Sequence, residues 1–244
     1  VRKICGFREG FEGRQDYDLV LRLTEHTERI GHIPRILYHW RSIPESSAAR
    51  FQAKDYAQDA GLRAIREALQ RRGEDAVVEP IAGLSGRYLV RYRLQGTPLI
   101  SIVIPTRDQP EMLETCLQSV FRKTAYSGFE VIIVDNDSRE SGTRDLFQRW
   151  REREPNRFRV VPLPIPFNFP ALVNEGVRDA RGELVLLLNN DIEVISGEWL
   201  EEMAAQAMRP RVGAVGTKLL YPDNTVQHAG VVLGIGGIAG HSHK

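Results

Sequence analysis

The sequence has few cysteines and no long apolar run, and each of these absences excludes a class of protein. Only two cysteines, Cys5 and Cys116, occur in 244 residues, and they do not form a C-x-x-C pair. A disulfide framework or a cysteine-rich zinc site is therefore not expected, and the composition fits a reducing compartment. No apolar stretch approaches the ~20 residues that a membrane helix needs, and the first residues do not resemble a secretory signal. We expect a cytoplasmic protein, and peripheral contact with the cytoplasmic face of the inner membrane stays open.

The sequence also lacks an excess of charge of either sign. Lys and Arg total 33, Asp and Glu total 32, and the formal net charge is +1. Because there is no polybasic tract, nucleic acid is not an expected partner. The hydrophobic content of 42% is sufficient for an ordinary globular core of one large domain or two small ones.

What is present is an alternation of short apolar runs and amphipathic segments in the second half of the chain. The runs have the length and β-branched composition of buried strands, and the segments between them have helical spacing and helix start or stop signals. The expected strands are 99–105, 129–138, 158–164 and 183–191, and the expected helices are 109–124, 141–154 and 170–182. This order predicts an α/β fold with a mostly parallel sheet.

Polar residues follow three of these strands at the point where each strand ends. They are Thr106, Arg107 and Asp108; Asp135 and Asp137; and Asn189, Asn190, Asp191 and Glu193. Ligands of open parallel sheets bind outside the carboxyl ends of the strands, so these side chains are expected to converge. Carboxylates that face one another repel unless a cation lies between them, and carboxylate and amide oxygens suit Mg²⁺ or Mn²⁺. The pattern predicts a phosphorylated ligand bound through a metal ion.

The motifs "SIVIPTRD", "VIIVDNDS", "FNFPALVNEGVRDARGE" and "LLLNNDIEV" occur in that order. They resemble the nucleotide-sugar half of inverting family 2 glycosyltransferases, which have the Rossmann-like GT-A fold, and the resemblance covers residues 98–244. It implies that a nucleotide-diphospho-sugar donor binds to residues from all four motifs. They are Pro105, Thr106, Asp108, Asp135, Asp137, Asn168, Asn174, Asn189 and Asn190. Asn189 replaces the first acid of the family's Asp-x-Asp motif, so Asp191 is expected to be the only protein carboxylate on the Mg²⁺ or Mn²⁺ ion.

The first 48 residues resemble the other half of the same fold, the half that binds the acceptor. The resemblance rests on "GFREGFEGRQDYDLVLRL" and "RIGHIPRILYHWR". It implies that Asp16 is the general base, which is needed because a sugar hydroxyl is a poor nucleophile until its proton is removed. Asp18 is expected to cap or stabilise the helix that follows, and His39 matches a position at which some relatives add a metal ligand.

The two halves stand in the reverse of the order found within one enzyme. We therefore expect a piece of a tandem glycosyltransferase, with residues 1–48 from one domain, a helical linker and short hairpin at 49–97, and an incomplete second domain at 98–244. A sharper hypothesis is that residues 1–48 dock on 98–244 and complete a single site. The resemblance implies inverting sugar transfer to a glycan or lipid-linked acceptor, in the synthesis of a bacterial surface polysaccharide.

Each candidate residue also has a simpler explanation. Asp135 and Asp137 are compatible with an Asx turn, "NND" with a tight turn, Asp16 with a helix N-cap, and His39 with an ordinary packed or solvated histidine. A rival function is a non-catalytic module that binds a nucleotide or a partner protein. A sugar-1-phosphate nucleotidyltransferase is disfavoured because "PTRDQPEML" is not a glycine-rich phosphate loop.

Overall fold

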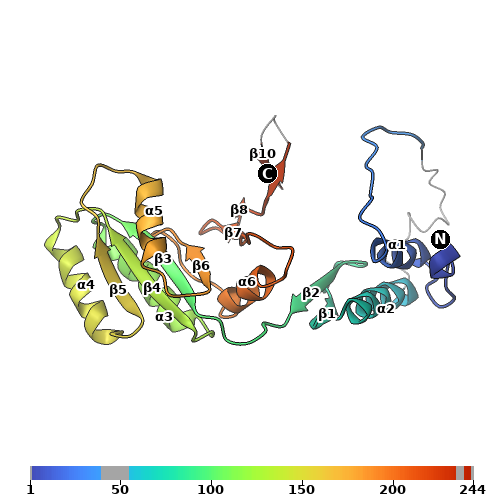
Figure 1. Cartoon of the computed structure of the whole chain (residues 1–244), viewed down its shortest axis with the longest axis horizontal. Coiled ribbons are helices and arrows are strands. Elements are labelled where there is room, and N and C mark those ends of the chain that lie inside the picture. Colours follow the sequence, from blue (N-terminus) through green and yellow to red (C-terminus); the bar gives the residue numbers. More distant parts are fainter. Residues whose placement is uncertain (1, 40–54, 235–238, 243–244) are drawn as a thin grey trace. The chain divides into compact units, whose positions relative to one another are not determined.

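The computed structural model describes residues 2–39, 55–234 and 239–242, and the chain divides into two compact units (Figure 1). The first unit comprises residues Val1–Arg93 and the second Leu94–Lys244. Each unit has its own hydrophobic core among the described residues. The candidate functional residues are divided between these two units.

The first unit combines helices with a hairpin. It contains the short helix η1 (Arg2–Ile4), the helices α1 (Gln15–Thr24) and α2 (Asp55–Arg72), and the antiparallel strands β1 (Ala76–Pro80) and β2 (Tyr88–Tyr92). The linker helix and hairpin expected from the sequence are present as α2, β1 and β2, although residues 49–54 lie outside the described part of the chain. The apolar face of α2 packs on the hairpin through Ile65, Leu69 and Val78.

The second unit is built on a parallel sheet. Its strands β3 (Ile100–Thr106), β4 (Phe129–Asp135), β5 (Phe158–Pro162) and β6 (Leu184–Leu187) lie in the order β5-β4-β3-β6, and every neighbouring pair is parallel. The chain builds the sheet from β3 toward β5 and then returns to the other side of β3 (Figure 1). The order therefore reverses between β3 and β6, and ligands of such sheets bind at a reversal of this kind.

Helices cover both faces of this sheet. They are α3 (Pro110–Lys123), α4 (Ser141–Arg153), α5 (Phe169–Arg178) and α6 (Trp199–Ala207). α3 begins with a proline, which suits the first helical position, and buries Leu113, Cys116, Leu117 and Val120 at helical spacing. The larger core cluster contains residues of α3, α4 and α6 against β3 and β4.

α5 covers the opposite face of the sheet, where the core cluster is smaller. A Cβ atom at Gly176 would lie 2.3 Å from a methyl carbon of Val103 and 2.8 Å from one of Val134. A larger residue there would push α5 away from the sheet, so glycine allows the close packing.

The prediction of an α/β fold with a parallel sheet flanked by helices is confirmed, but the expectation for the last strand is partly wrong. β6 is an edge strand in the described sheet, and Val185 and Leu187 are 42% and 52% exposed. By register these two residues lie beside Ser101 and Val103, on the face that α5 covers only in part. The apolar run indicated burial on both faces, whereas the strand order leaves one face of β6 open.

The remaining described elements are short strands. They are β7 (Leu219–Leu220), β8 (Val226–His228), β9 (Val231–Leu233) and β10 (Ala239–His241), paired antiparallel as β7-β8 and β9-β10. Within the described ranges, no helix has both the length and the apolar character needed to cross a bilayer.

Candidate functional site at the strand ends

The carboxyl ends of β3 and β6 are joined by a side-chain hydrogen bond. The Asn190 amide donates to the Thr106 hydroxyl over 3.0 Å, and the N–H of Leu188 donates to the carbonyl of Val103 over 3.0 Å. Thr106 is buried and Asn190 is half-buried. The structure therefore brings together two of the residues that the sequence assigns to nucleotide-sugar binding.

β4 ends beside β3, and its last residue, Asp135, is the register partner of Thr106. One carboxylate oxygen of Asp135 accepts the N–H of Ser138 over 3.1 Å. This bond is local, but it reaches the third residue on, whereas an Asx turn bonds the second. Asp137 has a φ of 61°, and its carboxylate forms an exposed ion pair with Arg139 at 3.0 Å. Both aspartates therefore shape the loop after β4. They lie at the carboxyl end of β4, which together with the carboxyl ends of β3 and β6 and the residues that follow them forms what we call the strand-end rim.

Asp108 joins the loop after β3 to the loop after β4. Its carboxylate accepts the backbone N–H groups of Arg139 and Glu140 over 2.7 and 3.0 Å, and its own N–H donates to the Ser138 hydroxyl over 2.8 Å. The hydrogen bond from the N–H of Glu140 makes the largest contribution to lowering the pKa of Asp108 below its ordinary value, and the bond from the N–H of Arg139 makes the next largest. Asp108 and Gln109 have φ values of 54° and 59°, a left-handed conformation that is uncommon outside glycine. The two loops thus form one connected structure.

A third loop is attached to this rim by Asn136, which the sequence reasoning missed. The buried Asn136 amide donates to the carbonyls of Leu163 and Ile165 over 3.0 and 2.8 Å, and this holds the segment after β5 against the end of β4. The "DND" spacing was assigned to ligand contact through its two acids. The central amide gave no separate signal, because its partners are backbone carbonyls far away in the sequence.

The remaining predicted donor-binding residues differ in their surroundings. Pro105 is half-buried in β3. Asn168 is the N-cap of α5, and its side chain accepts the N–H of Ala171 over 3.0 Å. Asn174 lies exposed on the same helix. The cap explains why asparagine suits position 168, and the structure gives Asn174 no comparable role in folding.

Asp191 differs from the other rim acids because no described residue forms a hydrogen bond or ion pair with its carboxylate. Asp191 and Asn189 are exposed, directly after β6. No group of three or more His, Cys, Asp or Glu side chains that could hold a metal ion is found in the described ranges. One carboxylate with a neighbouring amide oxygen fits a Mg²⁺ or Mn²⁺ ion that takes its other ligands from phosphate and water. The donor set is thus compatible with the predicted metal ion.

The candidate base, Asp16, lies in the first unit, in the first turn of α1. The helix begins at Gln15 with Arg14 at the N-cap position, so the alternative that Asp16 is the N-cap is wrong. Asp16 is exposed, and its carboxylate accepts the N–H of Tyr17 over 2.8 Å. His39, the other candidate from this unit, is also exposed.

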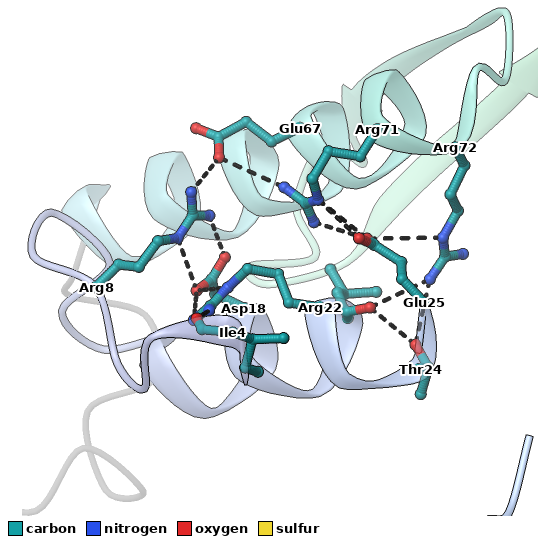
Figure 2. A network of polar contacts seen from close by, with 10 residues as sticks. Ile4, Arg8, Asp18, Arg22, Thr24, Glu25, Glu67, Arg71 and Arg72 are labelled. Carbon is teal, nitrogen blue, oxygen red and sulfur yellow. Dashed lines mark hydrogen bonds and ion pairs between the residues drawn. The ribbon is translucent and has the colours of Figure 1, made fainter. Parts of the chain in front are cut away.

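Asp18 lies two residues after Asp16 on the same helix. It is fully buried, and two arginines bind it (Figure 2). Arg22 donates to its carboxylate over 2.7 and 2.9 Å, and Arg8 binds the same carboxylate. Burial alone would raise the pKa of Asp18, but hydrogen bonds from Arg8 and Arg22 outweigh burial and hold it below the ordinary value. Asp18 is not a cap. It stabilises the helix through these ion pairs, which was the second of its two expected roles.

The same ion network continues from α1 to α2. Glu67 of α2 contacts Arg8 at 2.7 Å, and Arg71 of α2 contacts Glu25 at 2.8 Å (Figure 2). Arg22 also donates to the carbonyls of Ile4 and Gly6 over 2.6 and 2.8 Å. The network therefore fixes the position of α1, which carries Asp16, against α2 and the preceding segment.

Comparison with protein families and curated proteins gives consistent results. The family model described as glycosyl transferase family 2 matches residues 101–231. The uncharacterized protein y4gI of Sinorhizobium fredii is 47% identical over 245 residues, which is 100% of this chain and 27% of that protein. The O-antigen biosynthesis protein RfbC of Myxococcus xanthus is 47% identical over 243 residues, 99% of this chain and 18% of that protein. The chain thus spans between 18% and 27% of the length of these two relatives.

Two solved structures resemble parts of this chain. The mannosyltransferase PcManGT from Pyrobaculum calidifontis, in complex with GDP-Man and Mn²⁺, has a TM-score of 0.47 and 22% identity, over 71% of this chain and 47% of that one. TarS of S. aureus in complex with UDP-GlcNAc has a TM-score of 0.38 and 25% identity, over 45% of this chain and 31% of that one.

Proposed function

The chain belongs to glycosyl transferase family 2, and from this membership we propose that residues 98–244 bind a nucleotide-diphospho-sugar at the carboxyl ends of β3, β4 and β6. The observation that carries the proposal is the rim itself. Thr106 is the register partner of Asp135 and accepts a hydrogen bond from Asn190, beside the reversal of the strand order. Asp191 comes next in the chain, and its carboxylate has no partner among the described residues. A rim of acids and amides at this position suits a diphosphate bound through a cation.

The proposed cofactor is Mg²⁺ or Mn²⁺, held by Asp191 with the help of Asn189. When bound, such an ion neutralises the negative charge of the departing nucleoside diphosphate. The chain's own part is to orient the donor. Thr106, Asp108 and Asp135 would contact the base and ribose, and the joined loops after β3 and β4 would hold these groups in a fixed arrangement. Pro105, Asp137, Asn168 and Asn174 complete the proposed donor site.

The proposed reaction is a single displacement that inverts the anomeric carbon. A carboxylate of the Asp16 type would take the proton of the attacking hydroxyl as the new bond forms. Two observations support Asp16 over Asp18 as the base: Asp16 is exposed, and Asp18 is buried between arginines that keep it ionised. His39 is proposed as an additional metal ligand in the same acceptor-binding segment, and its exposed side chain is compatible with that role.

The proposed setting is bacterial surface polysaccharide synthesis, with a glycan or lipid-linked acceptor, at the cytoplasmic face of the inner membrane. RfbC supports it, because that O-antigen biosynthesis protein is similar to nearly the whole of this chain. We also propose that residues 1–48 and 98–244 derive from two consecutive glycosyltransferase domains. The much greater length of both relatives, which contain the two segments in the same order, supports this arrangement.

A second candidate function is a module that binds nucleotide without transferring sugar. The specific observation in its favour is Asn189, which stands where the family has its first acid and so lowers the negative charge available to a cation. This module would still use the strand-end rim. It would differ from the enzyme in turnover but not in nucleotide binding.

Calorimetry with UDP and GDP, each with and without Mn²⁺, tests donor binding. We expect Mn²⁺-dependent binding that Asp191→Asn weakens by at least about tenfold, because a charged ligand is lost. Glu193→Gln is the matched control, since this nearby acid is paired with Lys123. If neither nucleotide binds to the wild-type chain, or if the two variants bind equally, the proposed donor site is wrong.

Release of UDP or GDP from nucleotide sugars then separates the two candidate functions. Under the proposed tandem arrangement, the assay uses a protein that carries both consecutive domains. Binding without turnover in that protein would favour the module. Because Asp16 belongs to the preceding domain in the proposed arrangement, it is tested in a protein that also carries Asp191→Asn, which inactivates the second domain. Turnover that Asp16→Asn leaves unchanged in that background would reject Asp16 as the base.

A further inference from the structure

Helix α3 contacts the segment that carries Asp191 through one of its faces. Cys116 donates its S–H to the carbonyl of Asn189, with 3.7 Å between the sulfur and oxygen atoms. Ser119 accepts the N–H of Val194 over 3.0 Å, and Lys123 forms an ion pair with Glu193 at 2.7 Å. The three α3 residues are spaced by three and four positions, so they lie along a single face of the helix.

Two of these contacts are buried. Cys116 is fully buried and Ser119 is 5% exposed. The Ser119 hydroxyl donates to the carbonyl of Cys116 over 2.8 Å while it accepts the N–H of Val194, so both of its hydrogen-bonding functions are used. A hydroxyl held in this way cannot turn away from Val194 without breaking a second bond.

The same segment is attached on its other side to β3, through the Asn190 amide and the Thr106 hydroxyl. Residues 189, 190 and 194 are thus fixed, while the Asp191 carboxylate between them has no partner in the described part of the chain. The attachments hold the backbone, and they leave the exposed carboxylate available to a ligand. This is how a ligand-binding group is pre-organised on a segment that lies between β6 and α6.

We propose that Cys116 and Ser119 are positioning residues that hold residues 189–194 in the conformation in which Asp191 meets the cation and the diphosphate. This inference rests on the proposed function for the identity of the ligand. The positioning itself is a property of the free chain and can be measured there. Neither side chain touches the ligand, so both act through the backbone that carries Asp191.

Cys116 also provides a way to measure the positioning. Its side chain is fully buried and its sulfur contacts the carbonyl of Asn189, so alkylation requires a local opening of the structure around this contact. The only other cysteine, Cys5, is exposed and reacts without such an opening. Iodoacetamide labelling, resolved by peptide mass spectrometry, therefore contains a fast internal reference in the same chain.

The first experiment compares Ser119→Ala with Thr115→Ala in the ligand-free chain. Both changes remove a hydroxyl from α3, but the exposed Thr115 hydroxyl only donates to Glu111 of its own helix. We expect Ser119→Ala to increase Cys116 labelling and the amide exchange of residues 188–195 by about fivefold, the value of one net hydrogen bond. Exchange of β4 should stay unchanged, which excludes general loosening of the unit. Equal rates in the two variants, or equal acceleration in β4, would overturn the proposal.

The second experiment measures Mn²⁺-dependent binding of UDP and GDP to the same variants. We expect Ser119→Ala to weaken binding by about fivefold and Thr115→Ala to leave it unchanged, because the loosened segment must be reordered on binding. Unchanged affinity with faster exchange would overturn the link between the positioning and the ligand. If the wild-type chain binds neither nucleotide, the proposed function fails, and the exchange and labelling rates still decide whether Cys116 and Ser119 position the segment.

Discussion

The two units treat their acidic side chains in opposite ways. In the first unit, Asp18 is buried and binds two arginines. Arg22 also donates to two backbone carbonyls, and Arg8 also contacts Glu67. At the strand ends of the second unit, Asp108 and Asp135 accept backbone N–H groups, and Asp191 has no partner among the described residues. A carboxylate whose two oxygens both bind arginines contributes to the fold, whereas an unpaired one on a held segment is suited to a ligand.

The largest expected effect is on the stability of the first unit. Asp18→Asn leaves Arg22 buried with too few acceptors, so we expect a loss of about 3–5 kcal/mol in the stability of α1 against α2. Asp16→Asn, two residues away and exposed, should change stability by less than about 0.5 kcal/mol. Amide hydrogen exchange of α1 and α2 measures both. Similar exchange in the two variants would mean that the network does not hold α1 in place.

The second unit has one acid that resembles Asp18, at the opposite end of the sheet from the candidate site. Glu130 is 3% exposed and accepts hydrogen bonds from Arg159, Ser101 and the backbone of Arg181. Burial would raise its pKa, but the hydrogen bonds from Arg159 and Ser101 lower the pKa to about 2. Glu130 therefore belongs to the fold rather than to ligand binding, although it lies in the same strand as Asp135.

We expect Glu130→Gln to destabilise the second unit by about 2–3 kcal/mol, since Arg159, whose side chain is 22% exposed, loses this buried partner and keeps only Asp179. Because the pKa is lower in the folded state, the stabilisation by Glu130 is complete above the ordinary value of 4.5 and is lost as the pH falls toward about 2. Urea unfolding followed by the fluorescence of the buried Trp150, repeated between pH 6 and pH 3, measures this. The exposed Glu183→Gln is the control. The same acid sensitivity in Glu130→Gln and in the wild-type chain would contradict the assignment.

The sequence predicted the sheet and its helices because local patterns determine them. α3 could be recognised from its proline start, its apolar spacing and its basic end, all within 14 residues. The open face of β6 could not be predicted, because an apolar run does not show whether the strand lies at the edge of the sheet. The edge position follows from the return of the chain past β3, which only the sheet order reveals.

The candidate site shows the same limit. The acids at the strand ends were predicted from their positions, but their partners were not. Asp108 binds backbone groups more than 30 residues away, and Asp18 and Arg8 are ten residues apart. The sequence named acids as candidate ligands and could not separate those that the fold uses from the one that it leaves unpaired. That distinction depends on contacts between segments far apart in the chain.

A third prediction concerns position 189, where the resemblance to the Asp-x-Asp motif implies an acid. Asn189→Asp places a second carboxylate beside the exposed Asp191. We expect Mn²⁺ to bind about tenfold more tightly, because a carboxylate ~4 Å from a divalent ion gains ~1–2 kcal/mol even in water-like surroundings. Calorimetry with Mn²⁺ and UDP or GDP measures the change. Ser196→Asp adds the same charge at an exposed position beyond the segment and should give no comparable gain. Weaker binding by Asn189→Asp would show that the ion does not lie at this rim.

The smallest expected effect concerns the exposed ion pair between Lys123 and Glu193, whose side chains are 44% and 59% exposed. Such pairs typically contribute about 0.5 kcal/mol and are screened by salt. Lys123→Ala should therefore change the amide exchange of residues 188–195 by less than about threefold, and the difference should vanish in 0.5 M NaCl. Ser119→Ala should keep its effect in salt, because its hydrogen bond is buried. An effect of Lys123→Ala as large and as salt-resistant as that of Ser119→Ala would mean that charge, rather than buried hydrogen bonding, holds the segment that carries Asp191.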